Sequence, residues 1–147
     1  MTDKNYAIIK FHLLTPFYFP QRTLRRQAIL DLFKKEKVRL KALDYIFCTD
    51  EYLLRINQDF LKHDDLTDII TFDLSETKDS ITGEIYISID RVRENAAKFG
   101  VSLQTELLRV MFHGALHLCE YRDKKPKDVA MMRSKEDFYL TRFTKSQ

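Results

Sequence analysis

Two histidines lie four residues apart in an apolar segment of the chain. His113 and His117 occur in the run Val110–Cys119 (VMFHGALHLC), and Asp123 follows six residues after the second histidine. On an α-helix, residues four apart lie one above the other on the same face, so their imidazole nitrogens can bind one ion. Asp123 follows the expected helix end, where the chain can turn back and bring a carboxylate to a third position. The pattern therefore predicts a site for one divalent metal ion.

The donor set also indicates what such an ion would do. Two nitrogens and one oxygen leave the fourth position of a tetrahedral ion open to water, as in catalytic zinc sites. Zinc can lower the pKa of that water to about 7 and stabilise charge on a phosphate oxygen. Because aspartate is a hard ligand, manganese or another divalent ion is the alternative. The competing interpretation is a pair of ordinary core histidines, since this spacing also arises by chance.

Gly114 argues against one familiar use of such a site. Zinc proteases of the H-E-x-x-H type carry a glutamate general base directly after the first histidine, and this chain has a glycine there. We therefore do not expect peptide hydrolysis by that route.

Three ordered segments resemble motifs of the YbeY family of bacterial endoribonucleases, which act in ribosomal RNA maturation. The segment His113–Asp123 (HGALHLCEYRD) resembles the family signature H-G-x-L-H-L-x-G-Y-D-H, Thr67–Phe72 (TDIITF) resembles T-D-V-L-S-F, and Gly83–Ser88 (GEIYIS) resembles G-D-I-x-I-S. In the signature, six positions match: His113, Gly114, Leu116, His117, Leu118 and Tyr121. The resemblance spans about Asn57 to Leu140. It implies a metal-dependent, single-strand-specific endoribonuclease acting in ribosomal RNA maturation and ribosome quality control.

Three departures from the family pattern bear on the proposed site. Asp123 stands where the family has its third histidine ligand, and Glu120 replaces a glycine, so a turn that needs positive φ would be strained or differently shaped. Leu61 stands where the family has an arginine. The adjacent Lys62 and His63 are candidates to replace part of that arginine's work, by contacting a phosphate and by transferring a proton near pH 7. The alternative is that both are simply solvated loop residues.

Basic residues give a second indication of an RNA partner. The chain has a net charge of +3 and a pI of about 8.8, which is compatible with a polyanion without requiring one. Next to the metal motif, Lys124 and Lys125 are predicted to contact RNA phosphates. A second basic cluster (Arg22, Arg25, Arg26 and the segment Lys34–Lys41) could hold a phosphate backbone or form a solvated charged face.

Composition limits the setting in which this chemistry can occur. The 147 residues, 44% hydrophobic and 32% charged, predict one globular domain over residues 1–147. No apolar run is long enough to cross a bilayer, and the N-terminus lacks the pattern of a secretory signal. Cys48 and Cys119 are too few for a disulfide framework and are expected to be reduced. We therefore expect a cytoplasmic protein with no membrane partner. The family resemblance implies ribosomal RNA and a ribosomal subunit or assembly factors as its partners.

Periodicity predicts the elements that must position the site. They alternate irregularly, which favours an α+β fold with a small mixed four-stranded sheet packed against about five helices, the metal-binding helix being central. Strands are predicted at Tyr6–Leu13, Ala42–Cys48, Thr67–Leu74 and Glu84–Ile89, the last after a turn at Gly83. Helices are predicted at Thr23–Lys37, Asp50–Phe60, Asp90–Phe99, Ser102–Cys119 and Pro126–Thr144.

Three functions remain open at this point. The leading hypothesis is the endoribonuclease, with either activated water attacking phosphorus or a 2′-hydroxyl being deprotonated. The first alternative is a metal-assisted hydrolase of a small ester or amide. The second is a non-catalytic ribosome-assembly factor in which the metal has a structural role.

Overall fold

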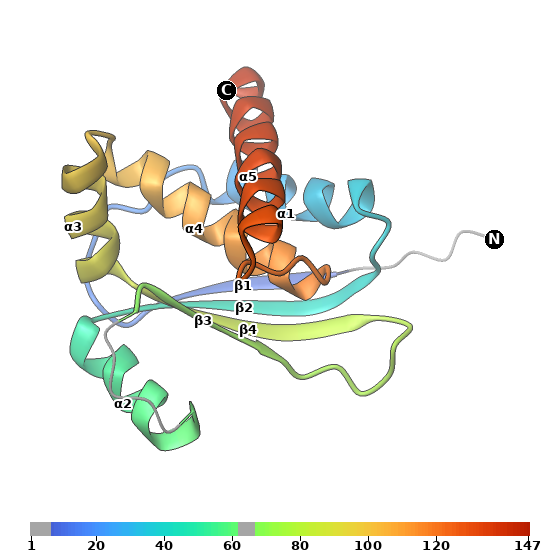
Figure 1. Cartoon of the computed structure of the whole chain (residues 1–147), viewed down its shortest axis with the longest axis horizontal. Coiled ribbons are helices and arrows are strands. Elements are labelled where there is room, and N and C mark those ends of the chain that lie inside the picture. Colours follow the sequence, from blue (N-terminus) through green and yellow to red (C-terminus); the bar gives the residue numbers. More distant parts are fainter. Residues whose placement is uncertain (1–6, 62–66) are drawn as a thin grey trace.

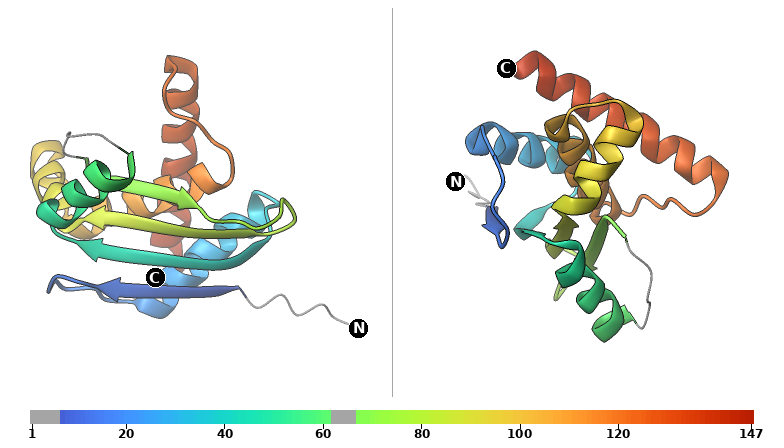
Figure 2. Two further views of the ribbon diagram at one scale, coloured as in Figure 1. Left: turned by 90° about the horizontal axis from the view of Figure 1, so that it is seen from below. Right: turned by 90° about the vertical axis from the view of Figure 1, so that its left-hand side faces the viewer.

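A mixed four-stranded sheet forms the centre of the computed structural model, which describes residues 7–61 and 67–147. Its strands are β1 (Ile8–Leu13), β2 (Leu40–Cys48), β3 (Ile69–Asp73) and β4 (Ile81–Ser88). They lie in the order β1-β2-β4-β3 (Figure 2). β1 and β4 pair with β2 in parallel, and β3 pairs with β4 antiparallel. The predicted mixed sheet is confirmed.

Five helices occur within the described ranges. They are α1 (Arg22–Lys35), α2 (Asp50–Leu61), α3 (Ile89–Phe99), α4 (Leu103–Leu118) and α5 (Pro126–Ser146). Figures 1 and 2 show α1, α3, α4 and α5 on one side of the sheet and α2 on the other. The predicted α+β class with five helices is confirmed. None of the described helices is both long and apolar enough to cross a membrane.

The helix ends that lead into α4 follow from local chemistry. Gly100 ends α3 in the left-handed conformation, with φ 68°, which glycine adopts without a Cβ clash. Two residues later, the Ser102 hydroxyl accepts a hydrogen bond from the backbone N–H of Thr105 at 3.1 Å and caps α4. Beyond α4, the loop of residues 119–125 leads to Pro126, which occupies the first turn of α5. These three end signals were predicted correctly.

α4 lies in the core, as its nearly uniform apolar sequence predicts. It packs between the sheet on one side and α1, α3 and α5 on the other. Ten of its residues are buried, and most belong to the main hydrophobic cluster. A helix held on several sides presents its polar residues in fixed directions.

Two glycines allow α4 to approach the sheet closely. Gly83 lies inside β4, so the prediction of a turn there is wrong. A Cβ at Gly83 would come 2.8 Å from Leu118 Cδ1 and 3.2 Å from the carbonyl oxygen of Phe72. A Cβ at Gly114 would come 2.9 Å from the side chains of Ile69 and Ile85. Both positions therefore exclude a larger side chain for packing reasons, and neither needs a positive φ.

Candidate metal centre

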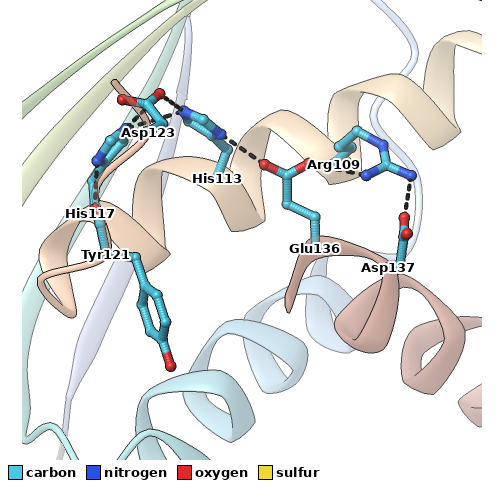
Figure 3. A network of polar contacts seen from close by, with 7 residues as sticks. All are labelled: Arg109, His113, His117, Tyr121, Asp123, Glu136 and Asp137. Atoms are coloured by element: carbon cyan, nitrogen blue, oxygen red, sulfur yellow. Dashed lines mark hydrogen bonds and ion pairs between the residues drawn. The ribbon is translucent and has the colours of Figure 1, made fainter. Parts of the chain in front are cut away.

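His113, His117 and Asp123 converge at the C-terminal part of α4 (Figure 3). The two histidine Nε2 atoms lie 3.0 Å apart. Asp123 Oδ2 lies 3.1 Å from Nε2 of His113 and 3.3 Å from Nε2 of His117. The structure thus brings together the three side chains that the sequence selected.

The spacing of these atoms fits one bound ion. Zinc–nitrogen and zinc–oxygen bonds of about 2.0–2.2 Å in tetrahedral geometry place neighbouring ligand atoms about 3.3–3.5 Å apart. The observed separations of 3.0, 3.1 and 3.3 Å are slightly shorter, so a small outward movement of the side chains accommodates the ion. All three residues are partly exposed, which leaves one side of the group open. This group could bind a metal ion and still admit a further ligand.

Each imidazole is oriented by a hydrogen bond through its other nitrogen. Nδ1 of His113 lies 2.7 Å from Oε2 of Glu136, and Nδ1 of His117 lies 2.9 Å from the carbonyl oxygen of Tyr121. Because both partners are acceptors, we assign the ring proton to Nδ1 in each histidine. The Nε2 lone pairs then face the common centre, as metal binding requires.

Glu136 belongs to the candidate centre through its contact with His113, and the sequence interpretation missed it. It comes from α5, and only 5% of its surface is exposed. Its second oxygen, Oε1, accepts a hydrogen bond from Arg109 Nη1 at 2.9 Å, and Arg109 Nη2 also donates to Asp137 at 2.7 Å (Figure 3). One signal in the sequence could have identified Glu136, because it is a carboxylate at a position that belongs to the apolar face of its helix. The buried residues of α5 are Met132, Glu136, Tyr139 and Phe143.

The electrostatics of the group favour a cation. Burial alone lowers the pKa of His113, but the hydrogen bond and charge of Glu136, with the charges of Asp123 and Asp68, raise it above the ordinary value overall. The surrounding carboxylates thus favour positive charge at this position. A divalent ion would supply that charge while leaving the imidazoles neutral.

The turn after α4 keeps the shape expected of a glycine although it contains Glu120. This residue has φ 72°, in the left-handed region. The N–H of Glu120 donates to the carbonyl of His117, and the N–H of Tyr121 donates to the carbonyl of Leu116, both at 3.0 Å. This is the hydrogen-bond pattern of a Schellman motif. The sequence predicted that this turn would be either strained or differently shaped. The structure shows the strained outcome, because Glu120 keeps the positive φ.

The side chain of Tyr121 is fixed from a distant part of the chain. Its hydroxyl donates to Oε1 of Glu36 at 2.7 Å, and Tyr139 and Lys135 donate to the other oxygen of the same carboxylate. Burial alone raises the pKa of Glu36, but these three hydrogen bonds and the charge of Lys135 lower it below its usual value. Tyr121 is therefore held at both ends, with its hydroxyl on Glu36 and its carbonyl on His117.

A cleft of about 1070 Å³ opens beside the group formed by His113, His117 and Asp123. Lys124 lines it and is exposed, whereas Lys125 is exposed at the N-cap of α5 and does not line it. Leu61, at the place of the family arginine, also lines the cleft and is 41% exposed. The candidates Lys62 and His63 lie outside the described residues.

The basic cluster on α1 is not a uniform solvated or RNA-binding face. Arg25 is 2% exposed, and its Nε donates to the carbonyl of Pro20 at 2.8 Å while Nη2 donates to Gln104 at 2.5 Å. Its guanidinium also lies over the ring of Phe19. Arg25 is therefore neither a phosphate-binding residue nor part of a solvated face, and both predictions are wrong for it. Its hydrogen bond to Gln104 links α1 to α4.

Comparison with known proteins agrees with the motifs. The sequence model of the family described as Endoribonuclease YbeY matches residues 19–144. The chain is 49% identical to the Endoribonuclease YbeY of Cytophaga hutchinsonii, over 94% of this chain and 96% of that protein. It is 47% identical to that of Flavobacterium psychrophilum, over 92% and 96% of the two chains.

A solved structure shows the same fold. The solution structure of TM1509 from Thermotoga maritima superposes with a TM-score of 0.63 and 27% identity, covering 94% of this chain and 89% of the other. The sequence match extends over nearly the whole chain, and it includes the helix that carries the two histidines. The chain belongs to the YbeY family of endoribonucleases.

Proposed function

We propose that this protein is a metal-dependent endoribonuclease that cuts single-stranded RNA and acts in ribosomal RNA maturation and ribosome quality control. The observation that carries the proposal is the convergence of His113, His117 and Asp123, whose ligand atoms lie 3.0 to 3.3 Å apart beside an open cleft. Membership in the endoribonuclease family supports RNA as the substrate. We place this activity in the cytoplasm, with ribosomal RNA and a ribosomal subunit or assembly factors as partners.

We assign zinc to this group, with manganese as the alternative. Two nitrogens, one oxygen and an open side are typical of catalytic zinc, although the aspartate would also suit a harder ion. When bound, a divalent ion would activate water near neutral pH and stabilise negative charge on a phosphate oxygen.

The protein's own residues prepare the site for that chemistry. Glu136 and the carbonyl of Tyr121 hold the two imidazole rings with Nε2 toward the centre. In this proposal Lys124, which is exposed and lines the cleft, contacts a phosphate of the bound strand. Lys125, one residue on, could extend that contact along the strand. Such contacts add affinity without reading sequence.

We retain Lys62 and His63 as candidates for the role of the missing arginine. They directly follow Leu61, which lines the cleft. In this proposal Lys62 contacts a phosphate and His63 transfers a proton to or from a substrate oxygen. Replacing His63 by Gln should then lower the cleavage rate without lowering metal content.

Metal analysis combined with RNA cleavage tests the proposed function. The purified protein and its Asp123→Ala variant are compared for zinc and manganese content and for cleavage of single-stranded and structured RNA. We expect one ion per chain, loss of most bound metal in the variant, and cleavage of the single-stranded RNA only by the metal-loaded protein. Full metal occupancy and full cleavage by Asp123→Ala would contradict the proposal.

The same preparation distinguishes the two alternative functions. Hydrolysis of a panel of small esters and amides, with no cleavage of RNA, would favour the small-molecule hydrolase. For the structural-metal alternative, His117→Ala is decisive: a lower melting temperature with unchanged RNA cleavage supports a structural metal. Lost cleavage in a folded variant supports catalysis.

A further inference from the structure

Glu106 is a buried carboxylate that borders the cleft and has no bonding partner in the described part of the chain. It lies in the first turn of α4, is 5% exposed, and lines the same cleft as the metal-binding group. Its backbone N–H donates to the carbonyl of Ser102 at 3.1 Å, but its side chain forms no hydrogen bond or ion pair with residues 7–61 or 67–147. Among the described residues, Nη1 of Arg25 is the enclosed side-chain atom that lacks a hydrogen-bond partner, so the carboxylate oxygens of Glu106 are open to the cleft rather than sealed in the core. A largely buried carboxylate that reaches a cleft without a partner of its own can accept hydrogen bonds from a bound molecule.

Helix capping does not explain Glu106. Ser102 is the N-cap residue, and its hydroxyl accepts the hydrogen bond from the N–H of Thr105 at position N3. A capping-box glutamate would stand at N3, whereas Glu106 is one residue further along. The helix dipole favours negative charge in this turn but supplies no hydrogen bond to the side chain.

The charges around Glu106 do not neutralise it either. Burial raises the pKa of its carboxyl, as do the charges of Asp68 and Glu136, whereas Arg109 and Arg133 lower it, and the result lies above the usual value. Arg109 is already paired with Glu136 at 2.9 Å. Arg133 lines the same cleft but forms no ion pair with Glu106, so a donor that enters the cleft can reach a carboxylate that no described residue binds.

An exposed aromatic ring borders the same cleft. Phe99 is the last residue of α3, and 56% of its surface is exposed. A short connection through Gly100 and Ser102 leads from it to the first turn of α4, where Glu106 lies. Single-stranded RNA is commonly bound by stacking of unpaired bases on such rings, while polar groups contact the base edges.

We propose that Glu106 and Phe99 form a nucleobase subsite that selects guanine in single-stranded RNA. This inference rests on the proposed function. The Watson–Crick edge of guanine presents two adjacent N–H donors, which match the two oxygens of one carboxylate. Uracil, cytosine and adenine each place an acceptor beside their donor on that edge, so they would leave an oxygen of Glu106 facing an acceptor.

The distance along α4 places this subsite close to the reacting phosphate. Glu106 and His113 are seven residues apart, nearly two full turns, so they lie on the same face and about 10 Å apart along the axis. A nucleotide that neighbours the cut phosphate can span that distance. The subsite would therefore choose where along a strand the bond is cut.

Binding of short RNAs tests the subsite independently of cleavage. Fluorescence anisotropy is measured for the zinc-loaded protein with 2′-O-methyl oligouridine probes that carry guanine, adenine, cytosine or uracil at the central position. Gel analysis afterwards verifies that the probes are intact. We expect the guanine probe to bind about tenfold more tightly than the other three. Equal binding of all four probes would overturn the inference.

Variants assign the preference to the two residues. Glu106→Gln, which replaces one acceptor by a donor, should abolish the guanine preference, and Glu106→Asp should weaken it. Phe99→Ala should weaken binding of all four probes, by about tenfold. Glu51→Gln, an exposed glutamate on α2, is the matched control and should behave as the unmodified protein. An undiminished guanine preference in either Glu106 variant overturns the inference, so Glu106→Asp decides it if Glu106→Gln does not fold.

Cleavage of the corresponding unmodified RNAs separates the two proposals. Cleavage without a guanine preference in binding would refute the subsite and support the nuclease. A guanine preference that depends on Glu106, without cleavage, would support the subsite and count against the nuclease.

Discussion

Replacing Glu120 by glycine should stabilise the protein. Glu120 has φ 72° at the end of α4, and a non-glycine residue in this conformation costs about 1–2 kcal/mol. Glycine removes that strain but raises the entropy of the unfolded chain by an amount equivalent to about 0.5–1 kcal/mol. The expected net gain in unfolding free energy is therefore about 0–1.5 kcal/mol, centred at about 0.7 kcal/mol. For a chain of this length, that corresponds to a rise in melting temperature of about 2 °C.

The assay must separate backbone strain from side-chain effects. Melting temperature and urea unfolding are measured on metal-free protein, because a bound ion would add its own stabilisation. Glu120→Ala is the matched control: it also removes the exposed carboxylate but retains the Cβ and the strain. We expect Glu120→Gly to be more stable than Glu120→Ala, which should resemble the unmodified protein. If both variants unfold at the same midpoint, the positive φ stores no strain and the reasoning is refuted.

Three further predictions concern the support of the site. Glu136→Gln should weaken metal binding about 10- to 100-fold, measured by chelator competition, because it replaces the carboxylate that orients an imidazole; unchanged affinity would contradict this role. Folding lowers the pKa of Glu36, so the stability that this carboxylate contributes should be complete above its ordinary pKa of 4.5 and lost as the pH falls through the lowered folded value. The melting temperature of the unmodified protein should therefore exceed that of Glu36→Gln at neutral pH, and the difference should shrink in acid. A difference that does not change with pH would refute this prediction. Gly83→Ala should destabilise the protein by about 1–3 kcal/mol in urea unfolding, because its Cβ would meet Leu118 at 2.8 Å; a neutral substitution would show that α4 shifts freely.

Much of the fold could be predicted because its signals are local. Gly100, Ser102 and Pro126 mark helix ends through interactions with neighbouring residues, and the structure confirms them. The relation between His113 and His117 is equally local, since one helical turn brings the two rings together.

The parts of the site that escaped prediction depend on distant contacts. Glu136 reaches His113 across 23 positions, and Glu36 reaches Tyr121 across 85, so no local pattern joins these pairs. Gly83 was misassigned to a turn for a related reason. A glycine required by a neighbouring helix has the same appearance in the sequence as one required by a bend.

The three proposed ligands come from one short stretch, His113 to Asp123, but the groups that hold the rings do not. Glu136 belongs to α5, and Tyr121 is fixed by Glu36 directly after α1. A chain that has not yet docked its last helix therefore possesses every ligand and still lacks the orientation that makes them a strong chelate. Tight binding of the proposed ion during synthesis should accordingly be a late event, and occupancy of the centre would report that α1 and α5 have packed around α4.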